Sequence, residues 1–467
     1  MASTSIYRNI ASTGNSNICT VSLWFKRGIT GVEKALFGGW RSNTDRFQIR
    51  IKSDNKMDVE YGYSGSWYSL ITTRLFRDTS AWMHLVLAVD STQATAANRE
   101  KLYINGVQET SFTTEDYMPQ NNNTLMTTAS DEMIVGASNA SSSAGSHQSW
   151  WDGCISHFQF VDGLALAPTE FGSFDTTSGI WKIKTGSYAT PGTNGFHLKF
   201  ENSANLDLDS SSNALTFTTE GTLIQTKDNP SSNFPTLSRT LGKQGTQYYL
   251  GDSVELVDGN LKAKNHSNDK SVAATQELRK GKWYWEVKLI GNSNTRNMGI
   301  VRADMIGENT HFYNGSTTNG TENTINYNPR TSYGSVVTTD KADSVTQNTG
   351  MASTDSDCIV GHFLDMDNGK MIWSLNGTLI NSGTSFSLPD WADGTWTKWG
   401  ALPSARLDHN QQGHFNFGNG YFATTAVASA VADAGGEGSF EYSPTATIDS
   451  SSQDFRCINT KNIATYG

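Results

Sequence analysis

The sequence WMHLVLAVDSTQATAANREKLYINGVQETSF, residues 82–112, predicts two apolar strands that are joined by a polar loop and followed by a tight turn. Its first arm, residues 82–90, carries apolar side chains on both alternating faces, so we expect this strand to be buried on both sides. After the second arm, residues 101–104, Asn105-Gly106 supplies the two positive-φ residues that a type I′ hairpin turn requires. The stretch therefore predicts antiparallel β structure.

A second unit of the same build lies about 270 residues further along the chain. Residues 358–366, CIVGHFLDM, form an apolar strand, DNG at 367–369 turns the chain, and residues 370–375 form the return strand. The pair NG at 376–377 then repeats the tight turn. Two such units predict two all-β domains of similar build.

The composition agrees with this prediction. At 467 residues the chain is too long for one ordinary hydrophobic core, so we expect two domains of roughly 200 residues each. The chain has 43 Gly, 9 Pro and 11% aromatic residues, and it shows no convincing amphipathic helix longer than about three turns. The predicted fold class is therefore all-β.

Charge and hydropathy exclude several classes of function. The formal net charge of −10 argues against a nucleic-acid-binding protein, which would normally carry a basic face. No run of about 18 apolar residues occurs, so we expect no membrane insertion. The start, MASTSIYRNI, lacks the basic and apolar regions of a signal peptide. The four cysteines are scattered without metal-ligand spacing, and we interpret them as buried free thiols of a protein made in a reducing cytoplasm.

Motifs in the first half carry a resemblance to a known family. They are LWFKRG at 23–28, WMH at 82–84 with its apolar run to residue 90, YING at 103–106, and WDGCISHFQFVDGLAL at 151–166. In this order they resemble the laminin-G-like, concanavalin-like jelly rolls that are common in structural proteins of tailed phages. Later motifs look like the same phage group, namely FG at 171–172, GIW at 179–181, GSY at 186–188 and GFHLKF at 195–200. The resemblance covers about residues 5–220.

Motifs in the second half resemble a SPRY-type β-sandwich over about residues 250–467. They are GKWYWEV at 281–287, MGIV at 298–301, GHFLDMDNGKMIWSLNG at 361–377, LP at 402–403 and FNFG at 415–418. The resemblance implies an interaction module whose specificity lies in the loops between strands. Residues 314–350 are long and polar and depart from a compact version of that fold.

The two resemblances define the predicted domains. Residues 1–200 form a laminin-G/concanavalin-like jelly roll, residues 201–249 a connector, and residues 250–467 a SPRY-like β-sandwich with a C-terminal extension. The end of that extension, residues 440–462, looks like phage relatives in which it closes the domain. The predicted architecture is two β-sandwich (jelly-roll) domains in tandem.

A concanavalin-like jelly roll can be a glycanase, so paired carboxylates are the catalytic signal to look for. Retaining glycosidases need two carboxyl groups about 5 Å apart, which one strand can supply at alternate positions. The nearest pair is Asp58 and Glu60, with no acid at residue 62, and we interpret it as a solvated strand face. His84 is expected to be packed or hydrogen-bonded in its strand. No serine-hydrolase, zinc-protease or phosphate-loop motif occurs, so we predict a protein that is not an enzyme.

Calcium is the cofactor to weigh, because related jelly rolls often hold it with loop carboxylates. Residues 365–369 and 207–213 contain closely spaced acids but lack the Gly and Glu positions of an EF-hand loop. We therefore predict no cofactor and no metal site, while a calcium site built from separate loops stays open.

Two aromatic-rich segments are the candidate binding sites. The segment 388–399, LPDWADGTWTKW, contains Trp391, Trp396 and Trp399 in a polar setting, and residues 61–68 contain three tyrosines and Trp67. Flat amphipathic rings of this kind stack on sugars or fill pockets of a partner protein, and they can equally cap a sandwich core. Trp399 is assigned to the core. Trp391 and Trp396 are predicted to be exposed, and the candidate contact residues are Trp391, Trp396, Trp67 and Tyr68.

The resemblance implies a non-enzymatic structural protein of a bacteriophage virion, such as a head fibre, a capsid decoration protein or a tail-associated adhesin. Such a protein would be made in the host cytoplasm and would bind host surface polysaccharide or neighbouring virion proteins. Self-association is expected, with a trimer favoured, because closed symmetry covers exposed sheet surface. Two alternatives stay open. One is a glycan-degrading enzyme with carboxylates from distant strands, and the other is a purely structural capsid cement protein.

Overall fold

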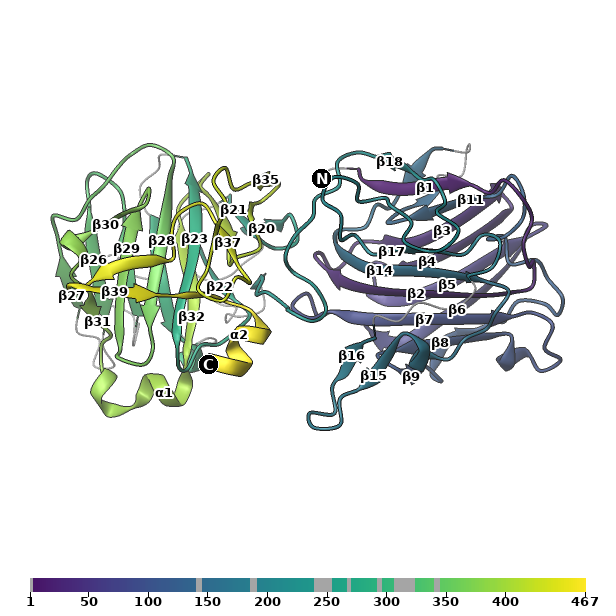
Figure 1. Ribbon diagram of the computed structural model, residues 1–467, viewed down its shortest axis with the longest axis horizontal. Helices are drawn as coiled ribbons and strands as arrows, with labels where there is room; N and C mark the ends of the chain where they lie inside the picture. Colours follow the sequence, from purple (N-terminus) through teal and green to yellow (C-terminus); the bar gives the residue numbers. More distant parts are fainter. Residues whose placement is uncertain are drawn as a thin grey trace. The chain divides into compact units, whose positions relative to one another are not determined.

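The computed structural model describes residues 3–139, 145–184, 191–238, 254–266, 270–291, 296–305, 324–339 and 345–467. Two compact units make up the chain, Met1–Gln225 (unit 1) and Thr226–Gly467 (unit 2), and both are built of strands (Figure 1). Among the described residues the only α-helices are α1 (Thr395–Trp399) and α2 (Thr460–Tyr466). The predicted all-β fold class is confirmed.

Unit 1 is a sandwich of two antiparallel sheets. In spatial order, the larger sheet has strands β10 (Phe112–Glu115), β6 (Ser66–Leu75), β5 (Lys56–Tyr63), β4 (Asp45–Ile51), β3 (Lys34–Ser42), β11 (Glu132–Val135), β1 (Ser5–Asn9) and β18 (Thr218–Glu220). The facing sheet has strands β17 (Phe196–Leu198), β14 (Gly153–Asp162), β2 (Ile18–Arg27), β7 (Met83–Asp90), β8 (Glu100–Ile104) and β9 (Val107–Gln108). Rings from both sheets meet in the core, where the centroids of Phe37 and Phe158 are 5.1 Å apart.

Strand β7 is buried on both sides, as the sequence predicted. Its core face carries leucines and a valine, and its outer face is covered by the hairpin of β15 (Gly172–Phe174) and β16 (Trp181–Ile183). The Nε1 atom of Trp181 donates to Nδ1 of His84 at 3.0 Å, and the Trp24 ring stacks on His84 with centroids 4.7 Å apart. Burial lowers the pKa of His84 to about 3, so this ring is neutral. The expectation that His84 is packed and hydrogen-bonded is confirmed.

Both Asn-Gly pairs are two-residue hairpin tips, as predicted. In unit 1, Asn105 and Gly106 have φ angles of 48° and 79° and connect β8 with β9. In unit 2, Asn376 and Gly377 have φ angles of 47° and 82° and connect β29 (Lys370–Leu375) with β30 (Thr378–Leu379). Local turn chemistry therefore determines both hairpins.

Gly106 is needed for space as well as for its positive φ. A Cβ atom at this position would lie 2.4 Å from the Trp181 ring. We expect Gly106→Ala to lower the free energy of unfolding by about 2–4 kcal/mol, because left-handed strain adds to a clash in a packed layer. The matched control is Gly65→Ala, where φ is 80° and nothing lies within 4 Å of the added Cβ, and its cost should be about 1 kcal/mol. Urea denaturation measures the free energy of unfolding of both variants. If Gly106→Ala and Gly65→Ala lose the same amount, the proposed clash with Trp181 is contradicted.

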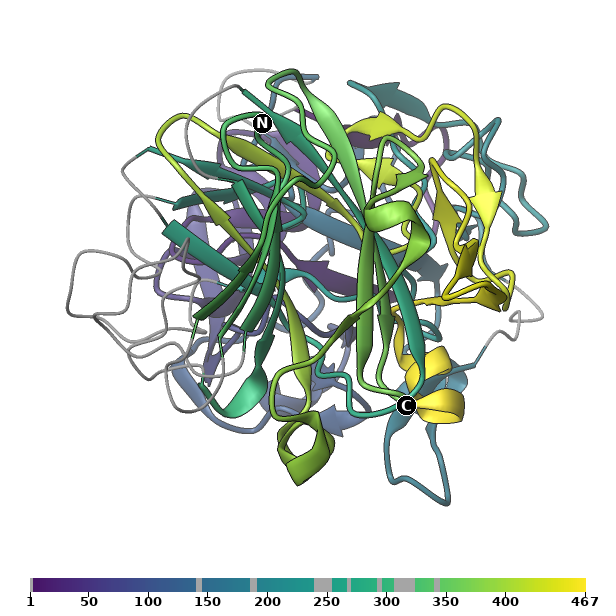
Figure 2. The same cartoon turned by 90° about the vertical axis from the view of Figure 1, so that its left-hand side faces the viewer.

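Unit 2 is a second sandwich, which faces the viewer in Figure 2. One sheet has strands β19 (Leu237–Ser238), β22 (Lys270–Ala274), β32 (Ala401–Leu407), β24 (Arg296–Arg302), β25 (Thr324–Asn328), β26 (Ser335–Thr339) and β27 (Val345–Asn348). The other has strands β20 (Val254–Val257), β21 (Lys262–Asn265), β33 (Gln412–Asn416), β23 (Lys282–Ile290), β28 (Cys358–Asp365), β29 and β30, with β31 (Phe386–Ser387) on β29 and β40 (Arg456–Cys457) on β23. Trp283, Trp285 and Trp373 are fully buried in its core.

The C-terminal segment, residues 431–458, adds a third layer on the outer face of the sheet that contains β23 and β28. It carries the hairpins of β36 (Val431–Ala432) with β37 (Ser439–Phe440) and of β38 (Thr445–Ile448) with β39 (Ser451–Asp454), yellow in Figure 2. Phe440 packs on Tyr284 with ring centroids 4.8 Å apart, and Phe455 packs on Phe363 at 5.2 Å. The outer face of this sheet is therefore closed by the end of the chain.

Glu286 of β23 is the buried acceptor on which this segment docks. Its carboxylate accepts hydrogen bonds from the backbone N–H groups of Glu441 at 2.9 Å and Tyr442 at 2.8 Å. It also accepts from the hydroxyl of Tyr284 at 3.0 Å and from Nδ2 of Asn416 at 3.2 Å. Burial raises the pKa of Glu286 to about 7, although these four bonds lower it. One internal carboxylate thus connects the sheet with the chain that covers it.

The expected connector, residues 201–249, is divided between the units. Residues 201–225 belong to unit 1, where β18 pairs with β1 and Phe217 packs in the core. Residues 226–238 belong to unit 2, and residues 239–249 lie outside the described residues. Of the segment 314–350, strands β25 to β27 form consecutive antiparallel pairs, while residues 314–323 and 340–344 also lie outside them.

Candidate functional site

A row of side chains crosses the outer face of the larger sheet of unit 1. The strand register places Trp40 of β3, Arg46 of β4, Gly62 of β5 and Trp67 of β6 side by side. The side chain of Trp67 is 41% exposed, and the guanidinium carbon of Arg46 lies 4.5 Å from its ring centroid. A Cβ atom on Gly62 would lie 2.4 Å from that ring, so glycine lets the indole lie against the strand. We call these four residues the tryptophan row.

An ion network lies beside the tryptophan row. Nη2 of Arg50 is 2.9 Å from Oδ2 of Asp58 and 2.6 Å from Oε2 of Glu60, and Oε1 of Glu60 accepts from Nε2 of Gln48 at 2.9 Å. Asp58 is only 1% exposed, and burial raises its pKa against the opposing effect of Arg50. The interpretation of Asp58 and Glu60 as a solvated strand face is therefore wrong. Arg50 binds both carboxylates, and this contact explains their burial.

Tyr68 points away from the tryptophan row. Successive residues of a strand face opposite sides of the sheet, so Trp67 and Tyr68 cannot contribute to the same surface. The half-buried Tyr68 packs against the core of unit 1, and its ring centroid lies 6.4 Å from that of Tyr61. Of the residues proposed in this segment, Trp67 alone lies on the outer face.

The prediction that Trp396 is exposed is wrong. Its ring is fully buried in the core of unit 2, and its Nε1 donates to the carbonyl oxygen of Pro389 at 2.6 Å. Two residues with positive φ precede α1 and fold this segment back onto the core. Trp391 is half-buried, because its ring packs over Gly369, where a Cβ atom would lie 2.1 Å away. Neither ring forms an open platform.

Trp399, which the sequence assigned to the core, is 38% exposed. It is the last residue of α1, and Gly400, with φ of 72°, then redirects the chain into β32. Nζ of Lys398 lies 4.6 Å from the Trp399 ring centroid. The exposed ring of this segment is thus Trp399, which resembles Trp67 in exposure and in its neighbouring cation.

A buried charge cluster lies at the other end of the same sheet. Nε2 of His147 is 3.0 Å from Oε1 of Glu132, and Nδ1 is 2.7 Å from Oε2 of Glu220. The Glu220 carboxylate also accepts from the hydroxyl of Ser5 at 2.8 Å and from Nε1 of Trp150 at 3.3 Å. Burial lowers the pKa of His147, but the two glutamates outweigh this effect and raise it. The cluster connects β11, β18 and β13 (His147–Gln148) through one imidazolium.

This cluster predicts a pH-dependent stability of unit 1. Because the folded-state pKa of His147 is raised, its contribution is fully present below about pH 6.5 and is lost as the pH rises through the raised value. We expect the melting temperature to fall as the pH rises from about 6.5 through the raised pKa of His147, and the fall to shrink in His147→Gln, which cannot titrate. Differential scanning calorimetry of both proteins measures this. If the melting temperatures of the wild type and His147→Gln fall equally with pH, His147 is not the group responsible.

The acidic segments considered for calcium act as turn caps. Oδ1 of Asp365 accepts from the backbone N–H groups of Asp367 and Asn368, both at 3.0 Å, and Oδ1 of Asp209 accepts from that of Ser211 at 2.8 Å. Over the described ranges, no group of three or more His, Cys, Asp or Glu side chains is arranged to hold a metal ion. The four cysteines are free thiols, and all but the half-buried Cys154 are buried. The prediction of no cofactor stays a prediction.

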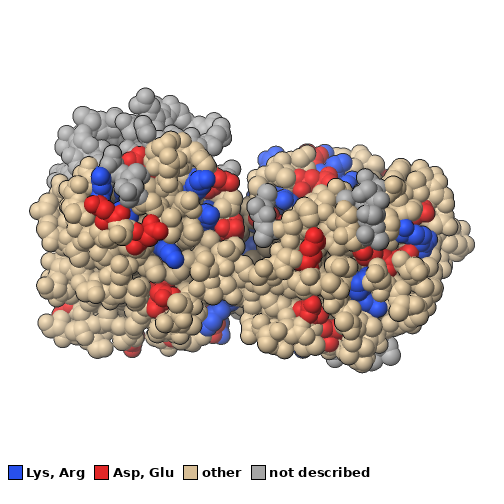
Figure 3. Space-filling model, turned by 90° about the horizontal axis from the view of Figure 1, so that it is seen from above, with Lys and Arg blue, Asp and Glu red and all other residues tan. Residues whose placement is uncertain are grey.

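The face shown in Figure 3 carries charges of both signs. Lys and Arg side chains are interspersed with Asp and Glu, and most of that face is neither. No large patch of one sign of charge is therefore seen on the described residues of this face. No helix in the part of the chain that the structure describes is both long and apolar enough to cross a membrane.

The sequence of unit 1 matches a known superfamily over most of its length. Residues 3–170 match the concanavalin A-like lectin/glucanases superfamily, in its laminin G form. Unit 1 therefore carries a concanavalin-like jelly roll, as its motifs implied. The superfamily's description names both lectins and glucanases, that is, binding proteins and enzymes. The tryptophan row lies within the matched residues. No curated protein sequence matches the chain.

Three of the solved structures to which the chain is similar are the following. Domains LG4-5 of the mouse laminin alpha1 chain are 7% identical, with 86% of this chain and 78% of that chain covered and a TM-score of 0.28. Domain 4 of an extracellular arabinanase from Geobacillus stearothermophilus, in complex with arabinotriose, is 22% identical, with coverages of 33% and 65% and a TM-score of 0.26. The SPRY domain of human HERC1 is 13% identical, with coverages of 35% and 92% and a TM-score of 0.26. Likenesses at these TM-scores support no statement about function.

Three members of the tryptophan row, Trp40, Arg46 and Gly62, were not predicted as site residues. They come from three strands, and only the pairing register brings them beside Trp67. A usable signal was the glycine at residue 62 within an otherwise alternating strand, because such a glycine often marks close approach of another group. Here that group is the Trp67 indole.

Proposed function

We propose that this protein is a non-enzymatic glycan-binding protein and that unit 1 holds a sugar ring against Trp67. The observation that carries the proposal is the Trp67 indole, which lies over Gly62 and keeps 41% of its surface open. Aromatic rings of this kind bind the apolar face of a sugar, while neighbouring polar groups bind its hydroxyls. Arg46 supplies donors at the ring, and Glu60, whose Oε1 lies 3.5 Å from Nη2 of Arg46, supplies acceptors.

The biological setting that we propose follows from the sequence resemblance to phage structural proteins. In it, the chain belongs to a virion as a head fibre, capsid decoration protein or tail-associated adhesin, and the glycan is host surface polysaccharide. Neighbouring virion proteins are its other partners, and three copies associate around a closed axis. Light scattering on the purified chain measures the copy number, and a monomer at high concentration counts against the trimer.

The experiment that tests the proposed function measures binding and cleavage together. The full chain is applied to an array of bacterial capsular and lipopolysaccharide O-chain polysaccharides, and bound polysaccharides are then incubated with it in solution. We expect at least one polysaccharide to bind and no reducing ends to appear. If no polysaccharide on the array binds the chain, the proposal is contradicted.

The second candidate function is glycan hydrolysis. It is favoured by the match of residues 3–170 to a superfamily that includes glucanases. The geometry around Asp58 and Glu60 is less suited to it, because Arg50 binds both carboxylates. Release of reducing sugar that disappears in the double variant Asp58→Asn with Glu60→Gln would favour this function. A fold control by circular dichroism is needed, since the same change weakens the Arg50 network.

A further inference from the structure

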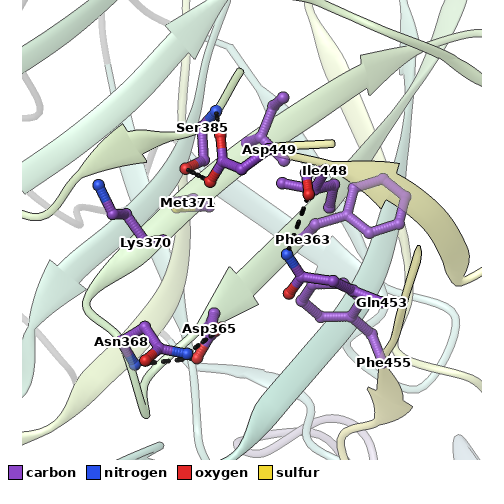
Figure 4. Close-up of a pocket in the computed structure, with 11 residues that line it drawn as sticks. Phe363, Asp365, Asn368, Lys370, Met371, Ser385, Ile448, Asp449, Gln453 and Phe455 are labelled. Atoms are coloured by element: carbon purple, nitrogen blue, oxygen red, sulfur yellow. Dashed lines mark hydrogen bonds between the residues drawn. The ribbon is translucent and has the colours of Figure 1, made fainter. Parts of the chain in front are cut away.

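A pocket of about 160 Å³ lies in unit 2, between the sheet and the C-terminal segment (Figure 4). Strands β28 and β29 form one wall, and the β38–β39 hairpin forms the other. The tryptophan row belongs to unit 1, so this pocket is separate from the site proposed above. No sequence motif pointed to it, because its walls are far apart in the chain.

The floor of the pocket is apolar. Phe363, Ile372, Ile448 and Phe455 line it, and each is at most 3% exposed. The two phenylalanine rings meet edge to face at an interplanar angle of 80°. An apolar cavity of about 150 Å³ is known to hold one benzene ring, so the volume suits one six-membered ring.

Polar groups with spare hydrogen-bonding capacity line the rim. Oδ1 of Asp449 accepts from the backbone N–H of Ser385 at 2.9 Å, and Oδ2 accepts from its hydroxyl at 2.5 Å. Each carboxylate oxygen keeps a second lone pair. Nζ of Lys370 donates to Oγ of Ser387 at 2.9 Å and keeps two further N–H donors. Figure 4 shows Asp449 and Ser385 on one side of the pocket and Asp365 on the other.

The charges around the pocket balance. Nζ of Lys282 lies 3.2 Å from Oδ2 of Asp365 and donates to Oε1 of Gln453 at 2.8 Å, so this carboxylate is already neutralised. Asp449 and Lys370 supply one charge of each sign at the rim. A charged ligand would be repelled by one of these groups as strongly as it is attracted by the other. A neutral ligand with hydroxyls, which can donate to Asp449 and accept from Lys370, fits both.

We propose that this pocket binds a single neutral pyranose ring, with its apolar face on the phenylalanine floor and its hydroxyls at Asp449 and Lys370. A ligand of about a dozen non-hydrogen atoms that is held in this way should have a Kd on the order of 1 mM. The pocket is thus a second, weaker sugar site, which would let one chain contact a glycan at two places.

The test uses saturation-transfer difference NMR on the full chain with the methyl glycosides of glucose, galactose, mannose and rhamnose. The test variant is Lys370→Met with Asp449→Asn, and asparagine is chosen because residue 449 has φ of 49°, which asparagine tolerates. Ser452→Ala, on β39 outside the pocket lining, is the matched control. Trp67→Ala removes the site in unit 1.

We expect at least one methyl glycoside to bind the wild type, the Ser452 control and Trp67→Ala, and its Kd for Trp67→Ala to rise at least tenfold when the two pocket substitutions are added to that protein. Any other pattern overturns the proposal. In particular, the glycoside could fail to bind Trp67→Ala but still bind the pocket variant with Trp67 intact. That result would rule out the second site and leave the proposed function at Trp67 unaffected. If the double variant does not fold, Lys370→Met alone is measured against the same expectation of weakened binding.

Discussion

Trp67→Ala should weaken glycan binding by about 10- to 100-fold while the chain stays folded. An aromatic anchor in a binding surface contributes about 1.5–3 kcal/mol, and each 1.4 kcal/mol is a tenfold change in Kd. The loss of stability in unit 1 should be smaller than for a core tryptophan, because 41% of the Trp67 side chain is already in solvent. Titration calorimetry with the polysaccharide selected by the array measures the affinity.

Trp399→Ala is the matched control for this experiment. Trp399 is 38% exposed and lies beside a cation, Lys398, just as Trp67 lies beside Arg46. It is in α1 of unit 2 and is not part of the tryptophan row. We therefore expect normal binding from Trp399→Ala. If Trp67→Ala and Trp399→Ala lose the same affinity for the polysaccharide, any exposed tryptophan contributes to binding. That result would contradict a specific site at Trp67.

Glu286→Ala should destabilise unit 2 by about 3–5 kcal/mol. The carboxylate has four hydrogen-bond donors around it, and each buried donor left without a partner costs about 1–3 kcal/mol. The loss should also loosen the C-terminal segment, because two of those donors are the backbone N–H groups of Glu441 and Tyr442. Denaturation in urea at about pH 8, above the pKa of Glu286, measures the stability. Limited proteolysis locates the loosened segment.

Glu437→Ala is the control for Glu286→Ala. Glu437 belongs to the same C-terminal segment, but its partner is the exposed Lys461, at 2.5 Å. A surface ion pair of this kind contributes little to stability, because solvent screens its charges. Equal losses of unfolding free energy in Glu286→Ala and Glu437→Ala would show that Glu286 does not hold this layer. The same follows if the C-terminal segment of Glu286→Ala resists protease as the wild type does.

Much of the fold could be predicted because its signals are local. The two Asn-Gly turns need only residues 105–106 and 376–377, and β7 shows its double burial within nine residues of sequence. The third layer of unit 2 could not be predicted in the same way, since residues 431–458 contain short strands with little periodicity. A signal was nevertheless present. Glu286 is an acid inside the apolar strand KWYWEVKLI, and a buried acid requires donors from another part of the chain.

The candidate site was predicted only in part, and the tryptophans show why. Spacing in a polar segment cannot distinguish Trp396 from Trp399, because burial depends on where the backbone turns between them. The positive φ angles before α1 bring Trp396 to the core, and Gly400 leaves Trp399 at the edge. Residues 61–68 were proposed for their aromatic content, and of the two contact residues predicted there only Trp67 lies on the outer face. Its neighbours Trp40 and Arg46 required the pairing register, which the sequence alone does not provide.

The central claim is that a glycan binds at Trp67, and fluorine NMR of the chain labelled with 5-fluorotryptophan tests it most directly. The 13 tryptophans each give one resonance, and Trp67→Phe and Trp399→Phe assign the two that matter. When the selected polysaccharide is added, we expect the Trp67 resonance to shift or broaden and the Trp399 resonance to stay in place. Polysaccharide binding that leaves the Trp67 resonance unchanged would contradict the claim.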